Sequence, residues 1–290
     1  MKNTHSHLSK IASTLAIVAL TFSISSCSEE EQLLENDTSN IVEDLTVDFD
    51  TEGTSDQQTT RASGDTPWEF DSSYSSRDDF QVDNDGNGAH NWDEDDYEDD
   101  PNDNGFDIRD YIYVDGSRFI LQCPNGNGRR RAEYRDQTNI DMDRRNRMDL
   151  TFDIRNYNNN SELIMAQLHN DDSRARRPYA TVVAEDGRIR LQRTNAPSGS
   201  STTTASETIP FRQNDRYRIR METRNGTRNL EVRIDNLDTG ERARNTFSFD
   251  SDWSALDGDF YWKHGAYMPD GGSNNTRMRV ETIYFATNRT

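Results

Sequence analysis

Three segments of the chain carry polar side chains at every second position. They are Arg131-Ala132-Glu133-Tyr134-Arg135, Gln167-Leu168-His169 and Tyr261-Trp262-Lys263-His264-Gly265-Ala266-Tyr267. On β-strands, alternate side chains project from the same face of a sheet. The spacing therefore predicts one face that collects Arg131, Glu133, Arg135, Gln167, His169, Tyr261, Lys263 and Tyr267. The intervening Leu168, Trp262 and Ala266 are expected to be buried on the opposite face.

This set of groups suits β-elimination next to a carboxylate, in which a base removes the C5 proton of a uronic acid and an acid protonates the departing C4 oxygen. Arg and amide donors can neutralise the carboxylate through charge-assisted hydrogen bonds. His titrates near neutrality, and a Tyr beside Arg and Lys is expected to have a lowered pKa, so either can move a proton. Taken singly, the segments also have simpler interpretations: an ion-pair ladder, a hydrogen-bonded histidine and aromatic packing.

The elements that must position these groups are strands. Apolar residues recur with period two in three further segments, and Gly, Asn and Asp turns separate such segments. The three sets are Met148, Leu150, Phe152 and Ile154; Tyr217, Ile219 and Met221; and Leu230, Val232 and Ile234. No amphipathic helix of any length is evident. The prediction is an all-β domain over residues 66–290, built as a large antiparallel sandwich or jelly roll.

The three polar segments also resemble, in the same order, the Arg-x-Glu-Leu-Arg, Gln-Ile/Val-His and Tyr-Phe-Lys-x-Gly-x-Tyr motifs of the family 7 alginate lyases. The resemblance runs from about Phe106 to the C-terminus and implies a β-jelly roll with a concave substrate cleft. It implies that Arg131 and Gln167 neutralise the substrate carboxylate, that His169 is the base or a further neutraliser, and that Tyr267 is the acid, or acid and base together. Glu133, Arg135 and Lys263 would orient these groups or, with Tyr261, bind the substrate.

Three features leave the substrate open between alginate and a sulfated uronate polymer such as ulvan. Tyr134 replaces the Leu of the first motif, and Met268-Pro269 follows Tyr267 where the family typically has Asn-Gln. In residues 106–290, 28 of the 29 basic residues are Arg, which pairs bidentately with carboxylate and sulfate groups. The expected activity is that of a carbon-oxygen lyase acting on an anionic uronic-acid polysaccharide. The main alternative is a non-catalytic glycan-binding protein on the same fold.

The charge of the chain is unevenly distributed. Residues 1–105 hold 4 Lys and Arg against 26 Asp and Glu, whereas residues 106–290 hold 29 against 27. The absence of a strong basic excess argues against nucleic acid as a partner. A mean hydropathy of -1.05 excludes a protein with many membrane spans.

The first 27 residues have the features of an export signal. Lys2 and Lys10 precede an apolar run from Ile11 to Ile24, and Ile24-Ser25-Ser26-Cys27 resembles a bacterial lipobox. Cys27 is thus the expected lipidation site, and residues 28–65 read as an acidic disordered tether. The expected location is the outer membrane or cell surface, through a lipid anchor; the alternative is a soluble secreted protein. Cys123, at an apolar strand end, is expected to be a buried small hydrophobe.

An acidic insertion is expected at residues 83–105. Within it, the segment from Asp83 to Glu94 fits the calcium-loop template, with ligands at Asp83, Asp85, Asn87 and Glu94. No helices are expected to flank it, so it differs from an ordinary EF-hand. A structural Ca²⁺ and a solvated acidic loop are the two interpretations. Catalysis by the three polar segments is expected to need no cofactor.

Overall fold

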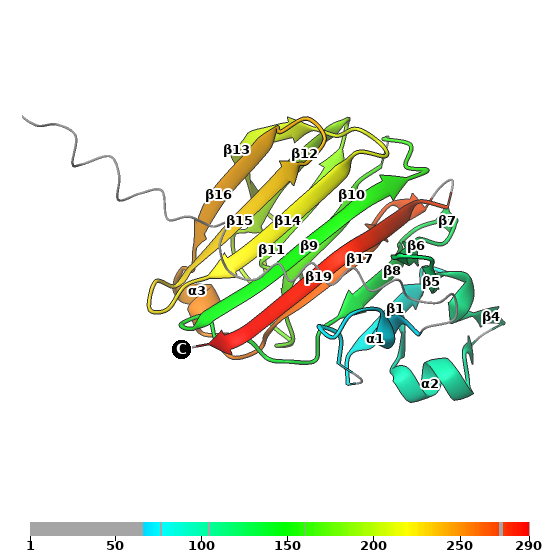
Figure 1. The fold of residues 1–290 in the computed structure, drawn as a ribbon. Helices are drawn as coiled ribbons and strands as arrows, with labels where there is room; N and C mark the ends of the chain where they lie inside the picture. Colours follow the sequence, from blue (N-terminus) through cyan, green and yellow to red (C-terminus); the bar gives the residue numbers. More distant parts are fainter. Residues whose placement is uncertain (1–65, 76, 104, 160, 273–274, 290) are drawn as a thin grey trace, which may run out of the picture. The chain divides into compact units, whose positions relative to one another are not determined.

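The long strands bury alternate side chains, as their period-two patterns predict. The computed structural model describes residues 66–75, 77–103, 105–159, 161–272 and 275–289 (Figure 1). The predictions for the export signal, for Cys27 and for the tether concern residues outside these ranges. Among the described residues, no helix is long and apolar enough to cross a membrane.

Two antiparallel sheets make up the domain (Figure 1). The eight-stranded sheet has the order β13 (Thr202–Pro210), β12 (Arg188–Thr194), β11 (Ala180–Glu185), β10 (Leu163–Asn170), β17 (Phe260–Met268), β8 (Arg130–Arg135), β1 (Asp79–Asp83) and β2 (His90–Trp92). The seven-stranded sheet has the order β16 (Arg242–Ser248), β15 (Asn229–Asn236), β14 (Arg216–Thr223), β9 (Arg145–Arg155), β19 (Arg277–Arg289), β6 (Arg118–Gln122) and β5 (Ile112–Asp115).

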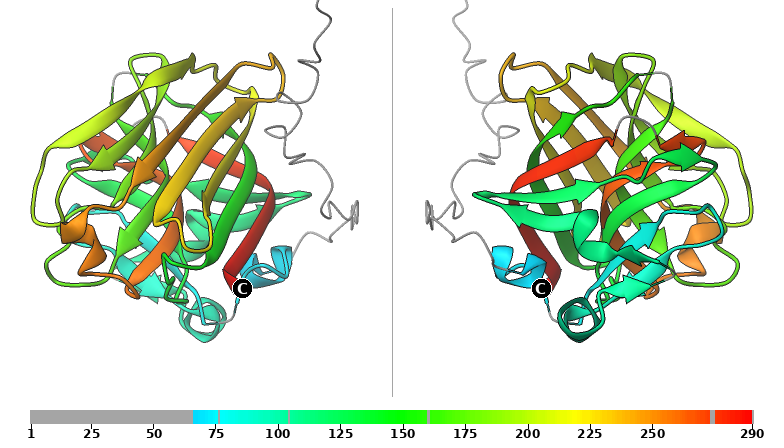
Figure 2. Two further views of the ribbon diagram at one scale, coloured as in Figure 1. Left: turned by 90° about the vertical axis from the view of Figure 1, so that its left-hand side faces the viewer. Right: turned by 90° about the vertical axis from the view of Figure 1, so that its right-hand side faces the viewer.

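The remaining elements are short. Two further pairs of strands are β3 (Asn102–Asp103) with β4 (Phe106–Asp107) and β7 (Gly126–Asn127) with β18 (Gly271–Gly272). The helices are α1 (Pro67–Phe70), α2 (Glu94–Asp99), the 3₁₀ turn η1 (Ile108–Asp110) and α3 (Ser251–Ser254). The α-helices lie at the margins of the sheets rather than between them (Figures 1 and 2).

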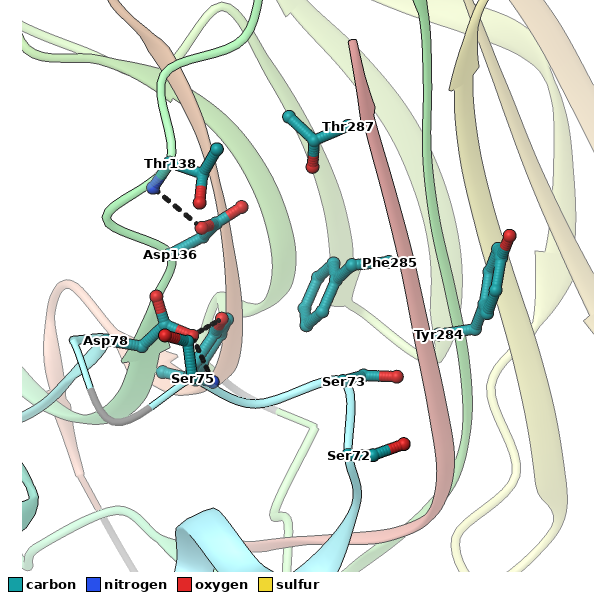
Figure 3. Close-up of a pocket in the computed structure, with 10 residues that line it drawn as sticks. Ser72, Ser73, Ser75, Asp78, Asp136, Thr138, Tyr284, Phe285 and Thr287 are labelled. Carbon is teal, nitrogen blue, oxygen red and sulfur yellow. Dashed lines mark hydrogen bonds between the residues drawn. The ribbon is translucent and has the colours of Figure 1, made fainter. Parts of the chain in front are cut away.

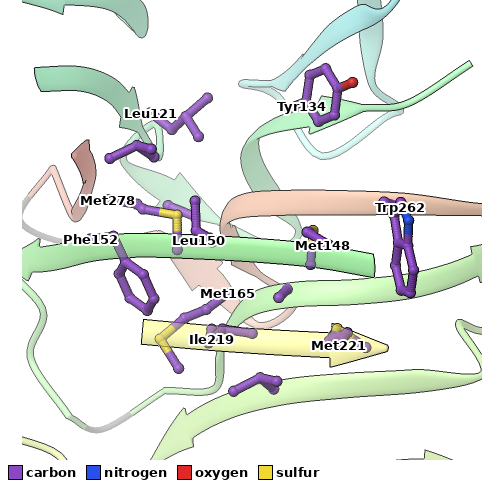
Figure 4. Close-up of a cluster of buried hydrophobic side chains, with 14 of the residues drawn as sticks. Leu121, Tyr134, Met148, Leu150, Phe152, Met165, Ile219, Met221, Trp262 and Met278 are labelled. Atoms are coloured by element: carbon purple, nitrogen blue, oxygen red, sulfur yellow. The ribbon is translucent and has the colours of Figure 1, made fainter. Parts of the chain in front are cut away.

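The hydrophobic core lies between the two sheets (Figure 4). The three period-two sets of the sequence fall on β9, β14 and β15, and all of their side chains are buried. From the eight-stranded sheet, Leu168, Trp262 and Ala266 are fully buried in the same core. Cys123 is free and buried, and burial raises the pKa of its thiol, so its expected role as a small hydrophobe is confirmed.

The structure of the acidic segment at residues 83–105 differs from the sequence-based expectation. Residues 83–105 were expected to interrupt the domain, but His90–Trp92 extends the sheet as its edge strand, paired with β1. Trp92 and Tyr97 are buried, and Trp92 packs edge-on against Phe106 with ring centroids 5.5 Å apart. These aromatic side chains supply the apolar burial that an acidic segment otherwise lacks, which explains why the segment folds.

Candidate active site

The strand register places the three polar segments side by side. Strands β10, β17 and β8 are consecutive in the eight-stranded sheet. Lys263 on β17 pairs with Gln167 on one side and with Arg135 on the other. Tyr261 pairs with His169, and Tyr267 pairs with Arg131. The structure therefore brings all eight predicted side chains to one face of the sheet, opposite the core; we call this the active-site face.

Gly265 makes the close approach of β17 to β8 possible. It occupies the position between Lys263 and Tyr267 on the active-site face and pairs with Glu133. Its φ is +151°, and a Cβ at this position would lie 2.7 Å from the Cα of Glu133. A side chain there would push the strands apart and fill the space above Glu133. The alternation of polar side chains predicted Lys263 and Tyr267 on this face but indicated no role for Gly265.

Glu133 is the centre of the site. Its carboxylate accepts hydrogen bonds from Lys263 Nζ at 2.8 Å, from Arg131 Nη1 at 3.2 Å and from Gln167 Nε2. Glu133, Gln167 and Lys263 are 1%, 2% and 3% exposed. We refer to Glu133, Arg131, Gln167 and Lys263 as the Glu133 cluster. It holds two cations against one carboxylate, so its formal charge is +1.

Burial and mutual attraction set the protonation of this cluster. Burial raises the pKa of Glu133, but the positive charges of Lys263 and Arg131 outweigh it and the net pKa lies below the usual range. Burial lowers the pKa of Lys263 to about 8, although the Glu133 carboxylate opposes this effect. At neutral pH both groups are therefore charged, and Lys263 loses its proton in mildly alkaline solution.

His169 lies beside the Glu133 cluster and is partly buried. The imidazole ring of His169 stacks with the ring of Tyr261, and their centroids are 5.3 Å apart. The guanidinium carbon of Arg135 lies over the Tyr261 ring, 4.7 Å from its centroid. Burial and the charge of Lys263 lower the pKa of His169 to about 4. Nδ1 lies 2.9 Å from the carbonyl oxygen of Asn170 and 2.9 Å from its amide nitrogen, so it donates to the carbonyl in one tautomer and accepts from the amide N–H in the other. When Nδ1–H donates to that carbonyl, Nε2 is unprotonated and can accept a proton.

Tyr267 lies on the other side of the cluster. The guanidinium carbon of Arg131 is 4.4 Å from the centroid of its ring. The expectation of a lowered pKa is wrong, because burial raises the pKa of Tyr267 more than the charge of Arg131 lowers it. Its hydroxyl is thus protonated near neutrality, which fits a proton donor better than a proton acceptor.

On the core-facing side of β8, the hydroxyl group of Tyr134 takes part in a separate polar network. Tyr134, which replaces the expected Leu, donates a hydrogen bond to Asp78 at 2.6 Å. Both residues line a cavity of about 380 Å³ at the margin of the core, together with Asp136 and several hydroxyl side chains (Figure 3). Because Tyr134 and Glu133 project from opposite faces of β8, this cavity is not part of the active-site face.

The structure does not gather the predicted calcium ligands. Asp83 is buried at the end of β1, where its carboxylate accepts hydrogen bonds from Arg129 at 2.8 Å and from the Gly86 amide at 2.8 Å. Asp85 binds Asn87, and Glu94 starts helix α2 beyond strand β2. Among the described residues, the group of three acidic side chains close enough to share an ion is elsewhere, at Asp141, Asp143 and Asp257. A calcium site at Asp83–Glu94 stays a prediction.

An antiparallel β-sandwich with Arg, Gln, His and Tyr side chains across one sheet face is the arrangement that the resemblance to polysaccharide lyases implies. Residues 93–287 match the model of the alginate lyase family, which is more than half of the chain. The chain therefore belongs to the alginate lyase family and is a polysaccharide lyase. No curated protein matches the sequence.

Solved structures show the same fold. The alginate lyase of Pseudomonas aeruginosa is 16% identical with a TM-score of 0.54, over 73% of this chain and 98% of that one. The alginate lyase from Klebsiella pneumoniae is 11% identical with a TM-score of 0.54, over 73% and 95%. Alginate lyase A1-II′, a member of polysaccharide lyase family 7, is 16% identical with a TM-score of 0.50, over 62% and 84%. The predicted jelly roll is thereby confirmed.

Proposed function

We propose that this lyase cleaves an anionic uronic-acid polysaccharide, with alginate as the main substrate, by β-elimination at the active-site face. The observation that carries the proposal is the Glu133 cluster, which has a formal charge of +1 and lies between a neutral imidazole and a protonated phenol. A uronic acid carboxylate complements that charge. The two proton-transferring groups then have opposite tasks, because their environments keep one deprotonated and the other protonated.

Arg131 and Gln167 neutralise the substrate carboxylate in this mechanism. Each donates one hydrogen bond to Glu133, which fixes its position, and each keeps further N–H groups for a ligand. Neutralisation matters because removal of the C5 proton moves negative charge onto the carboxylate as an enolate forms. Donors that are already oriented stabilise this charge without reorganising. Glu133 is therefore a positioning residue.

Proton transfer uses His169 and Tyr267. Nε2 of His169 accepts the C5 proton, and the electrons of that C–H bond form the C4–C5 double bond. The bond between C4 and its oxygen breaks, and the Tyr267 hydroxyl donates its proton to the departing oxygen. Water then restores the proton of Tyr267 and takes the proton from His169. No water molecule is added to the sugar chain.

The pH dependence of kcat/KM should be bell-shaped. Activity should rise as the pH increases through about 4, because His169 must be neutral to accept a proton. It should fall as the pH increases through about 8, because loss of the Lys263 proton removes the net positive charge of the cluster. Initial rates by ultraviolet absorbance of the unsaturated product, over the stability range of the protein, test this.

Lys263→Arg provides the matched control, because Arg stays charged throughout the alkaline range. This variant should lose the fall near pH 8, even if its maximal rate is lower. An alkaline limb that is the same in the variant and the parent would show that Lys263 is not its source.

The distribution of arginine favours alginate over a sulfated substrate. Many arginines lie on the outer face of the seven-stranded sheet, where they pair with acids. Asp149, for example, binds Arg147, Arg218 and Arg220 at 2.5 to 3.0 Å. The arginine excess noted in the sequence is thus largely used in ion pairs away from the active-site face. Parallel assays on alginate, ulvan and glucuronan test this choice, and the fastest rate on ulvan would overturn it.

The N-terminal segment supports a further proposal, that the enzyme is exported and anchored to the outer membrane by lipid at Cys27. Cys27→Ser should move the protein from the membrane fraction to the soluble fraction and leave its specific activity unchanged, because Cys27 is proposed only as an anchor. Fractionation of cells that express each form, followed by immunoblotting and activity assays, measures this. Equal membrane association of the two forms would contradict the lipid anchor.

A further inference from the structure

The polar surface of the active-site face continues past β8 onto the hairpin of β1 and β2. Gln81 on β1 pairs with Glu133 on β8, and Asn91 on β2 pairs with Gln81. Gln81 Nε2 donates a hydrogen bond to Asn91 Oδ1 at 2.6 Å. Gln81 is buried, whereas Asn91 is exposed. Two amides thus extend the row that begins at the Glu133 cluster.

The hairpin holds these amides in a fixed position. Phe80 and Trp92, which pair with each other on the opposite face, are 0% and 3% exposed. Phe80 packs edge-on against Trp68, and Trp92 packs against Phe106. Side chains on such a rigid element lose little conformational entropy when they bind a ligand. Both strands precede residue 93, where the match to the alginate lyase family begins.

The chemistry of the pair suits sugar hydroxyl groups. Asn91 uses its carbonyl oxygen to accept from Gln81, so its NH₂ group remains as a donor, and Gln81 keeps its carbonyl oxygen as an acceptor. Gln81 is flanked on the same face of β1 by Asp79 and by Asp83, whose carboxylate pairs with Arg129. Neutral amides, which both donate and accept, suit hydroxyl groups, whereas a second carboxylate would be bound better by a cation.

We propose that Gln81 and Asn91 form a distal binding position for the hydroxyl groups of a sugar residue in the bound polymer, on the β2 side of the Glu133 cluster. The inference rests on the proposed function. Adjacent strands lie about 4.8 Å apart, so Asn91 is about 10 Å from β8 across the sheet. A chain that lies across the strands reaches this position only if it extends beyond the reacting residues. Affinity should therefore depend on substrate length.

Asn91→Ala and Gln81→Met test the position. Both remove amide groups, and Gln81→Met keeps the length of the side chain. Asn229→Ala, which removes a strand amide on the seven-stranded sheet, is the matched control. Each variant is measured for retardation in gels that contain alginate, which needs no turnover, and for KM and kcat on alginate oligosaccharides of increasing length. Melting temperatures report whether the fold is intact.

The expected result is a loss of affinity of about 3- to 10-fold for the polymer and for long oligosaccharides with Asn91→Ala. The shortest cleaved oligosaccharide and kcat should be unaffected, and Asn229→Ala should behave as the parent. Retention equal to the parent, or an equal rise in KM at every length, would overturn the distal position. If the parent is retained by alginate but forms no unsaturated product, the proposed reaction is contradicted. The comparison of gel retention between the parent and the variants still tests the distal binding position in that case.

Discussion

Tyr267→Phe should lower turnover by about 100- to 10,000-fold and leave binding of the polymer close to that of the parent. The phenyl ring can still pack beneath Arg131, which lies 4.4 Å from the centroid of the Tyr267 ring, so the surface that meets the substrate is largely kept. The variant lacks the proton that the departing oxygen requires. Initial rates and gel retardation on alginate measure the two properties separately.

Arg131→Ala should give a different pattern and serves as the comparison. Arg131 meets a carboxylate that is charged before the reaction and gains charge during it, so both binding and rate should fall. Rate loss without binding loss is thus specific to Tyr267. If Tyr267→Phe keeps more than about a tenth of the parental rate, a loss far below the usual range for a positioned acid, then Tyr267 is not the acid.

Glu133→Gln should destabilise the protein by roughly 3 to 5 kcal/mol, because it leaves the buried ammonium of Lys263 without its counter-charge. Lys263 is 3% exposed and its Nζ lies 2.8 Å from the Glu133 carboxylate. Burial already lowers the pKa of Lys263, and removal of the Glu133 charge should lower it further. Denaturant unfolding of the variant and the parent measures the loss.

The lowered pKa of Lys263 in Glu133→Gln also determines how the stability of the variant depends on pH. In the variant the unfolded chain binds a proton at Lys263 more tightly than the folded chain does, so the folded state gains stability as the pH rises. The deficit relative to the parent should be larger at about pH 6 than at about pH 9. Glu133→Gln combined with Lys263→Met should recover part of the stability but not the activity. A deficit that is independent of pH, with no recovery in the double variant, would contradict a buried ion pair at this site.

The fold was largely predictable because its strands alternate cleanly. Met148, Leu150, Phe152 and Ile154 have the spacing of a strand with one buried face, and β9 buries all four. The same rule placed the polar side chains of β8, β10 and β17 on one face. Alternation is a local property that holds wherever the other face of the strand is packed against a core.

The resemblance implied that Glu133 orients its neighbours or binds the substrate, but its place at the centre of the cluster was not predictable, because it depends on which strands are neighbours. Its partners Gln167 and Lys263 are 34 and 130 residues away in sequence, and only the register of β10, β17 and β8 brings them together. The pKa of Tyr267 was mispredicted for a related reason. The sequence indicates the charge of nearby arginine, but the depth of burial, which has the larger effect, is a property of the folded sheet.

The acidic segment before Phe106 differs from the prediction because its few aromatic residues influence its structure more than its overall composition does. Its many carboxylates favour a solvated loop, but Trp92 and Tyr97 are buried, and β2 pairs with β1. Gln81 and Asn91 consequently lie on the active-site face. The cross-strand pair of Phe80 and Trp92 helps to stabilise this short edge strand, whose backbone hydrogen bonds come from β1.

The masses of the products released from alginate test the central claim most directly. Elimination divides the chain without adding water, so the masses of the two product chains should sum to that of the substrate, and one product should carry the unsaturated residue. Mass spectrometry of a defined oligosaccharide, incubated with the parent and with Tyr267→Phe, distinguishes the outcomes. The account predicts an unsaturated product from the parent and almost none from the variant. Products that together contain one additional water would show hydrolysis and contradict the lyase mechanism.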